Sequence, residues 1–326
     1  MSDVRILVPG LRDALVAARA AGGGGLAVRW LRQLLARSRA ATPGETVTGV
    51  RPDEPPGWER TLAQALGYTE PGNGGETGSA LRTWLASPVA LNAGMRDLTA
   101  RPVDGVADTD REALWAAAAP ELEKVGARLD QSPQGLWLLS MAAAGADGTR
   151  SPSAGWGRPM PAAGLDSEAA RCLQVLGNAI QMAWFQHPVN QQREQSGLDP
   201  VQGLWFWSPG EPPPAAPAVR VAGGGIHGRW LAETAGADWN PDPASGGDVI
   251  VMDSLDGPAS PERMAALLTS LVLEVIAPRA AGLRFGRTGR LEIEDPLLPP
   301  AEGPRRILRG RDTWALWRRR MPWPGL

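Results

Sequence analysis

The stretch GGDVIVMDSLDG at residues 246–257 decides the fold class. Its apolar core, VIVM, has the length of a buried strand and is bounded by glycine and aspartate. Helical periodicity is expected on both sides of it, at residues 227–235 and 261–276. The chain opens in the same way, with a strand pattern at residues 4–8 and a helical pattern at residues 25–37. This alternation predicts an α/β fold with a mostly parallel sheet.

Charge and composition exclude several function classes. The 326 residues include 33 basic and 35 acidic side chains, a net charge of −2. There is no overall field to attract nucleic acid or an anionic membrane, so neither partner is expected. The single cysteine excludes an internal disulfide. The only two histidines, His187 and His227, leave few ligands for zinc or copper.

The apolar segments of the chain predict a cytoplasmic protein with no membrane span. The first residues, MSDVRILVPGLRDAL, lack the charged start and long apolar core of a signal peptide. The stretch MAALLTSLVLEVIA at residues 264–277 contains Thr and Glu and is shorter than the roughly 20 residues that a membrane helix needs.

One internal boundary is expected in residues 142–164, which contain mostly Gly, Pro, Ser and Ala. Residues 1–150 then form the N-terminal part of the α/β core with an inserted helical subdomain. Residues 151–326 complete the core and contain the most distinctive motif. An organisation as one domain remains open at this point.

That motif is HPVNQQREQSGLDPVQGLWFWSPG at residues 187–210. Arg193 can offer a bidentate fork to a phosphate or carboxylate, and Asn190 and His187 can supply further hydrogen bonds. The three residues are therefore candidates for binding an anionic small molecule. The alternative is structural: His187 and Asn190 satisfy backbone groups where a helix stops, and Arg193 pairs with Glu194 or Asp199.

Two further features near this motif have both a functional and a structural interpretation. Trp205 and Trp207 alternate on an expected strand and so face the same side, where they can stack on a ligand or pack in the core. The glycine run AGGGIHGRW at residues 222–230 precedes a helix. It can present backbone N–H groups to a phosphate, or it can be a tight turn between strand and helix.

The sequence NAIQMAWFQHPVNQQREQSGLDPVQGLWFWSPG at residues 178–210 resembles the regulatory protein RpfE family of bacteria. In that family a helix ending in His-Pro-x-Asn is followed by Arg, Gly, Pro and a Leu-Trp-x-Trp-Gly strand. Supporting matches are ILVPGL at residues 6–11, LRTWLASPVAL at residues 81–91 and WALWRRRMP at residues 314–322. The resemblance implies an association with the regulation of pathogenicity factors, without a molecular mechanism.

A similar His-Pro-x-Asn-x-x-Arg block occurs in the archaeal-type cofactor-independent phosphoglycerate mutases. This similarity implies an alkaline-phosphatase-like layered core with a smaller subdomain. Such enzymes hold two metals with several Asp and His residues beside a Ser nucleophile. This chain departs from that pattern, because Pro9-Gly10 follows the first strand and residues 253–258 contain no histidine.

The carboxylates Asp13, Asp253 and Asp256 are the remaining candidates for a metal site, and ordinary turn aspartates are the alternative. We therefore interpret the chain as a non-catalytic regulatory or ligand-sensing protein that needs no cofactor and binds a small anionic or phosphorylated ligand. The first alternative is an active phosphomutase or phosphatase with Mn²⁺ or Mg²⁺ on those carboxylates. The second is a protein–protein interaction module with exposed tryptophans.

Overall fold

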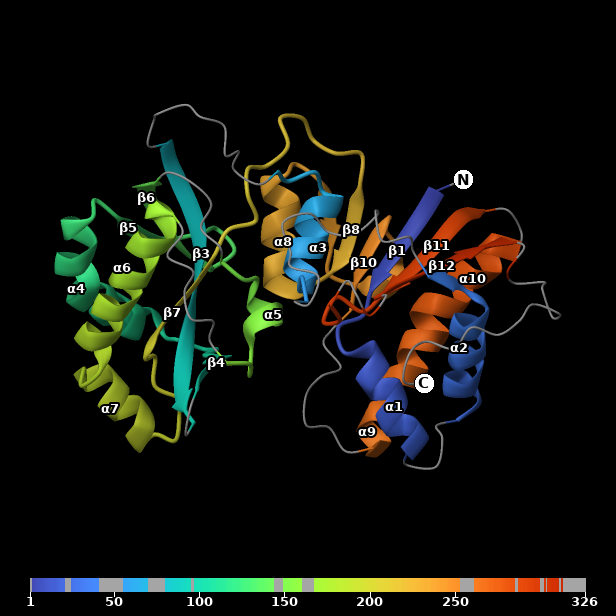
Figure 1. Ribbon diagram of the computed structural model, residues 1–326, viewed down its shortest axis with the longest axis horizontal. Coiled ribbons are helices and arrows are strands. Elements are labelled where there is room, and N and C mark those ends of the chain that lie inside the picture. The colour runs from blue at the N-terminus through green and yellow to red at the C-terminus, as the bar shows by residue number, and fades with distance from the viewer. Residues whose placement is uncertain are drawn as a thin grey trace. The chain divides into compact units, whose positions relative to one another are not determined.

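The computed structural model divides into two compact units, shown as a ribbon in Figure 1. Unit 1 comprises Met1–Tyr68 and Pro212–Leu326, and unit 2 comprises Thr69–Glu211. Unit 2 is thus inserted into unit 1, and the boundary expected near residue 150 lies inside unit 2. The structure describes residues 2–20, 25–40, 55–69, 80–94, 97–143, 149–159, 167–252, 261–284, 287–299, 302, 304–310 and 312.

The sheet of unit 1 has the strand order β2-β12-β11-β1-β10-β8-β9. Its parallel part contains β1 (Ser2–Leu7), β8 (Arg220–Gly223), β9 (Asp238–Asn240), β10 (Val249–Val251) and β11 (Thr288–Glu294). The strands β2 (Arg39–Ala40) and β12 (Arg305–Arg309) are antiparallel at one edge. The expected α/β fold with a mostly parallel sheet is confirmed.

The helices of unit 1 pack on both faces of this sheet. The main core lies between the sheet and one group of helices, α1 (Leu11–Ala20), α2 (Leu26–Arg37), α9 (Pro261–Ser270), η3 (Leu271–Ile276) and α10 (Ala277–Arg284). The helices α3 (Trp58–Ala65) and α8 (Gly225–Thr234) pack against each other and against β10 and β8 (Figure 1). Ile6 on the central strand pairs with Ile250 on one side and Ile293 on the other, all in that core.

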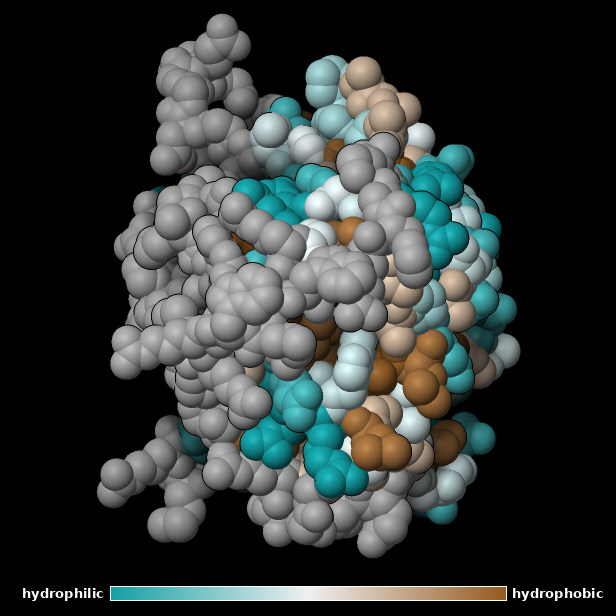
Figure 2. Space-filling view, turned by 90° about the vertical axis from the view of Figure 1, so that its right-hand side faces the viewer, coloured by the Kyte–Doolittle hydropathy of each residue, from teal (hydrophilic) through white to brown (hydrophobic). Residues whose placement is uncertain are grey.

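The run Met264–Leu283 is long and apolar enough to cross a membrane by length and composition, contrary to the expectation for this segment. A core helix of a globular domain passes the same test, and 39% of its most apolar window is buried here. Leu268 and Leu271 lie in the core, whereas Leu267 and Leu273 are exposed. Figure 2 shows the right-hand side of Figure 1, where apolar side chains lie among polar ones.

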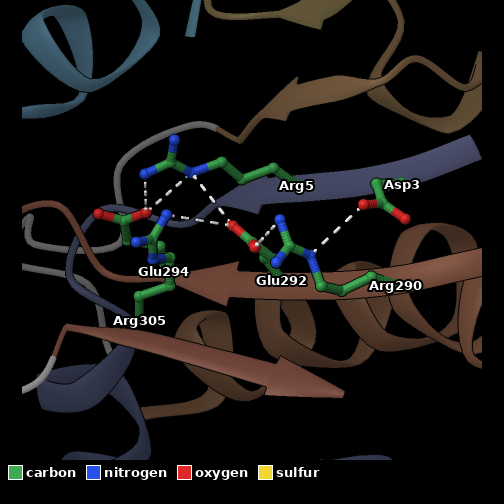
Figure 3. A network of polar contacts seen from close by, with 6 residues as sticks. All are labelled: Asp3, Arg5, Arg290, Glu292, Glu294 and Arg305. Atoms are coloured by element: carbon green, nitrogen blue, oxygen red, sulfur yellow. Dashed lines mark hydrogen bonds and ion pairs between the residues drawn. The ribbon is translucent and has the colours of Figure 1, made fainter. Parts of the chain in front are cut away.

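The second face of the β1–β11–β12 sheet carries a network of charges, drawn in Figure 3. Glu292 and Glu294 alternate with the core residues of β11 and are almost fully buried. Arg5 pairs with both, with its Nη2 2.5 Å from Glu294 Oε2, and Arg305 Nη1 lies 3.3 Å from Glu292 Oε2. Arg290 pairs with Glu292 and also with Asp3. Three arginines thus balance three acids, so the network fixes β1 on β11 and offers no uncompensated charge to a ligand.

Unit 2 is built on an antiparallel sheet. Its strands are β3 (Ala80–Ala93), β4 (Leu98–Pro102), β5 (Arg128–Gln131), β6 (Trp137–Ala143) and β7 (Gly203–Trp207), of which β4, β6 and β7 pair with β3. The helices α4 (Asp108–Lys124) and α6 (Glu168–Trp184) cover one face and enclose the core of this unit. Two shorter helices, α5 (Pro152–Gly155) and α7 (Pro188–Gln195), complete the described part of unit 2.

Most described tryptophans lie in the cores. Trp84, Trp184 and Trp207 are fully buried, and Trp205 and Trp230 are nearly so. Among the described residues, Trp30 is the tryptophan that stands out as exposed, at 37%. The described part of the chain therefore presents little of the tryptophan surface on which the interaction-module alternative depends.

Candidate functional site

The histidine of the predicted motif begins α7. His187 is the N-cap residue, and its Nδ1 accepts a hydrogen bond from the backbone N–H of Val189 at 3.3 Å. Pro188 occupies the first helical turn, where a missing N–H costs nothing. The imidazole thus caps the chain reversal between α6 and α7.

Asn190 is a buried clamp between the end of α6 and the segment before β7. Its Nδ2 donates to the carbonyls of Trp184 at 2.9 Å and Val201 at 2.8 Å. Its Oδ1 accepts from the backbone N–H of Val201 at 2.8 Å. The amide group is therefore used within the fold, as the structural interpretation of the motif requires.

Arg193 is also buried, with 4% of its surface exposed. Its Nε donates to the carbonyl oxygen of Asp199 at 2.9 Å, and its Nη1 lies 3.3 Å from the carboxylate of Asp110. The carboxylate of Asp199 pairs instead with Arg101. The structure brings His187, Asn190 and Arg193 together at one chain reversal, where their described contacts are to the protein itself; an anion-binding role for them stays a prediction.

Trp205 and Trp207 lie on one face of β7, as their alternation predicts. The Nε1 of Trp205 donates to the carbonyl of Arg150 at 2.8 Å. Its ring meets Trp156 at a centroid distance of 5.3 Å and packs against Gly155, where a Cβ would lie 2.2 Å from the ring. The ring of Trp205 therefore already has protein on its surface.

The proposed carboxylate metal site is only partly described. Asp13 lies in the first turn of α1, is largely exposed and faces Arg12 Nε at 3.4 Å. Asp253 and Asp256 lie outside the described residues. Within the described ranges, no group of three His, Cys, Asp or Glu side chains is placed to hold a metal ion.

A second candidate site lies at the carboxyl ends of the parallel strands of unit 1, the edge at which α/β sheets hold their ligands. Here β8 runs into α8 through Gly223, Gly224 and Gly225, with φ values of 77°, 74° and 53°. A Cβ on Gly223 would lie 2.0 Å from the carbonyl oxygen of Val251. The glycine run is therefore a tight turn that a side chain at Gly223 would prevent, as its structural interpretation holds.

This turn also exposes helix amides. Gly224 is the N-cap of α8, and among the described residues no side chain makes a cap hydrogen bond to the helix. Helix geometry leaves the N–H groups of Gly225, Ile226 and His227 without partners inside the helix. Gly225 and Ile226 are exposed. The turn thus presents donors and the positive end of a helix dipole to its surroundings.

A histidine and a buried carboxylate stand beside the turn. His227 Nδ1 lies 3.7 Å from Glu59 Oε1, and Glu59 is 1% exposed. Trp58 stacks on His227 at a centroid distance of 6.2 Å, and its ring lies 3.3 Å from the position of a Cβ on Gly224. We name Gly223–Gly225, His227, Glu59 and Trp58 the α8 site.

The neighbouring turn, between β1 and α1, is closed by a side chain of the protein. Asp295, directly after β11, accepts hydrogen bonds from the backbone N–H groups of Gly10, Arg12 and Leu297 at 2.9 to 3.1 Å. Burial raises the pKa of Asp295 to about 6, although these three bonds lower it. A carboxylate of the chain thus occupies the N-terminus of α1.

Sequence reasoning missed Glu59, Trp58 and Asp295. Asp295 had a usable signal, because it follows the strand pattern LEIE in the same way that Asp253 follows VIVM. Glu59 had none: a glutamate in the first turn of a helix is ordinarily solvated, and only tertiary packing buries it.

No family model matches the chain, and no curated protein matches it. Among solved structures, protein PH0037 from Pyrococcus horikoshii is 13% identical with a TM-score of 0.40, over 94% of this chain and 86% of that one. A cofactor-independent phosphoglycerate mutase from Thermoplasma acidophilum is 15% identical with a TM-score of 0.34, over 94% and 89% of the two chains. At these values the likeness is distant and assigns no activity, and the resemblance to the RpfE family stays a prediction.

Proposed function

We propose that this chain is a non-catalytic, ligand-sensing protein of the RpfE type and that it binds a small anionic, phosphate-bearing molecule at the α8 site. The observation that carries the proposal is the start of α8, where no side-chain cap bond is made and the exposed residues Gly225 and Ile226 follow the N-cap. Backbone N–H groups at a helix start satisfy phosphate oxygens, and the helix dipole favours the negative charge.

His227 supplies the side chain of this site. It is the third residue of α8, so its own amide is among the donors and its imidazole lies beside the turn. Glu59 Oε1 lies 3.7 Å from Nδ1 and Trp58 stacks on the ring, so side chains of α3 hold the imidazole in place. The backbone donors at the start of α8 then face the anion, with the imidazole beside them.

Donor chemistry favours binding without a catalytic metal pair. A two-metal phosphotransferase site needs several histidines and carboxylates in one place. Of the two histidines in the chain, His187 uses its Nδ1 as a helix cap and His227 faces Glu59. The regulatory role rests on the sequence resemblance to the RpfE family, in which the HPVN block is the most specific match.

A thermal unfolding experiment on the full chain tests the proposal. Inorganic phosphate and 3-phosphoglycerate are each added alone, because a ligand that binds only the folded state raises the unfolding midpoint. At a hundredfold excess over Kd the expected stabilisation is about 2.7 kcal/mol. The absence of any shift with either probe contradicts the proposal.

A matched pair of variants locates the binding. A Cβ on Gly225 meets nothing within 4 Å, and its φ of 53° is one that Asn and Asp tolerate. Gly225→Asp places a carboxylate at the turn and should abolish the shift, whereas Gly225→Asn should keep it. Equal shifts in both variants would place the anion elsewhere, with the HPVN block as the next candidate.

The same experiment with Mn²⁺, Mg²⁺ or Zn²⁺ addresses the alternative activity. A shift with 3-phosphoglycerate that appears only with a metal present would favour the phosphomutase or phosphatase. Phosphoryl transfer would then be assayed directly, with Asp13→Asn as the first variant.

A further inference from the structure

A second polar site lies in unit 2, on the face of the sheet opposite α4 and α6. Ser87 on β3 pairs across the strands with Trp205 on β7, and Leu85 pairs with Trp207. The alternate residues Trp84 and Ala86 belong to the core with α4 and α6. Ser87 and Trp207 therefore share the other face and are diagonal neighbours, about 7 Å apart at the backbone.

Both residues carry a buried polar atom that has no hydrogen-bond partner in the structure. These atoms are the hydroxyl oxygen of Ser87, which is 8% exposed, and the indole Nε1 of Trp207, which is fully buried. Two other buried indoles of unit 2 are paired: Trp184 Nε1 donates to the carbonyl of Leu114 at 2.7 Å, and Trp205 Nε1 donates to that of Arg150. On the opposite face of the unit, Trp115 Nε1 is also buried without a partner. An unpaired buried polar group costs about 1 to 3 kcal/mol, so two of them on diagonal neighbours of one sheet face need a physical explanation.

The chemistry of these atoms defines what fits between them. Trp207 Nε1 can only donate, and the Ser87 hydroxyl can donate as well. The neighbouring positions on this face, Leu85, Val89 and Trp205, are uncharged and buried. A charged acceptor would be left without compensation there, whereas an uncharged oxygen can accept both hydrogen bonds.

We infer that Ser87 and Trp207 form a binding site for one uncharged oxygen, which accepts hydrogen bonds from Ser87 Oγ and Trp207 Nε1. A buried water has this chemistry, and so does the carbonyl or hydroxyl oxygen of a small neutral molecule. In this site Trp207 donates a hydrogen bond from its Nε1 and does not stack its ring on the ligand. This site is separate from the α8 site and does not depend on the function proposed for it.

A crystal structure of the full chain, at a resolution that shows ordered waters, tests the inference directly. The expected result is a density peak within hydrogen-bond distance of both atoms. Mass spectrometry of the small molecules released on denaturation then identifies the source. A neutral molecule in stoichiometric amount indicates an organic ligand, and its absence with the density present indicates water. Density showing no oxygen between the two atoms overturns the inference.

Stability measurements provide an independent test. If the oxygen is bound, Ser87→Ala and Trp207→Phe each lower the unfolding midpoint, and the double variant lowers it by less than the sum of the two shifts. Ser140→Ala is the matched control, because Ser140 lies on β6 with its hydroxyl exposed beside Thr83. If nothing is bound, removing the unpaired hydroxyl of Ser87 leaves the midpoint unchanged or raises it, which also overturns the inference.

Discussion

Two helices of unit 1 begin at the same edge of one sheet, and their first turns are completed in different ways. The turn before α1 is closed by Asp295, whose carboxylate accepts from two amides of that turn. The turn before α8 has a glycine at the N-cap and, in the part of the chain that the structure describes, no side-chain cap bond. Both helix starts favour an anion, and among the described residues a carboxylate binds only at the start of α1. We therefore expect an external anion to bind at the start of α8 and not at the start of α1.

Local sterics produce this difference. After β11 the chain places Asp295 beside Gly10, which has a φ of 77° and turns the chain into α1. At α8, the carbonyl of Val251 approaches Gly223 so closely that no side chain fits. Gly57 N–H donates to the carbonyl of Pro296 at 3.0 Å, so α3 with Glu59 is anchored next to Asp295.

The largest expected effect comes from a methyl group on the α8 turn. Gly223→Ala should destabilise the chain by about 4 kcal/mol or more, because its Cβ meets a backbone oxygen at 2.0 Å and its φ is positive. Gly225→Ala is the matched control: it has open space, so only the strain of its φ remains, at about 1 kcal/mol. Urea unfolding measures both, and equal losses would contradict the described turn.

The carboxylate of Asp295 at the turn before α1 should make the free energy of unfolding depend on pH. The folded-state pKa of Asp295 is raised to about 6 from 3.8, so the folded state binds this proton more tightly than the unfolded state does. The contribution of Asp295 to stability is full below pH 4 and is lost as the pH rises to 6. Relative to Asp295→Asn, the wild type should therefore lose about 2 kcal/mol between pH 4 and 7.

Unfolding free energies of the two proteins at each pH provide this difference. The comparison removes the titration of every other group, because both proteins share them. A difference that is constant across the range, or that grows with pH, would show that Asp295 does not carry a raised pKa.

The smallest expected effect comes from placing a carboxylate at the turn before α8, as Asp295 does at the turn before α1. Gly225→Asp adds a carboxylate at the start of α8, and Gly225→Asn adds the same shape without charge. The Asp variant should be more stable than the Asn variant by about 0.5 kcal/mol, and salt should reduce that margin. Chemical unfolding at low and high salt measures it, and an Asp variant that is the less stable of the two would argue against a favourable helix start.

The spacing of apolar residues predicts those helices and strands that bury one regular face in a core. The strand VIVM and the helical patterns at residues 25–37 and 227–235 appear as β10, α2 and α8. The exposed side of α6 is less predictable: the helical spacing of Cys172, Val175 and Ile180 suggests one apolar face, but Val175 is 64% exposed. The buried set is shifted to Leu173 and Leu176, because the strands of unit 2 determine which side of the helix is covered.

The site was harder to predict, because its chemistry depends on tertiary contacts. A His, an Asn and an Arg around a helix end look alike in sequence whether they bind a ligand or brace the backbone. Asn190 braces two backbone segments through contacts that spacing does not reveal. Conversely, the glycine run was visible in the sequence, but Glu59 joins it only through the packing of α3 on α8.

The pairing of the first strand with late strands affects the order of folding during synthesis. Arg5 pairs with Val249 and Glu292, whereas the sheet of unit 2 is complete within Thr69–Glu211. On the ribosome, unit 2 therefore has all of its strands before β1 meets either of its neighbours. Such long sequence separation slows folding, and the apolar β1 has to remain unpaired until β10 and β11 are made. Assembly of the α8 site is thereby among the last events, since the strand that braces its turn is β10.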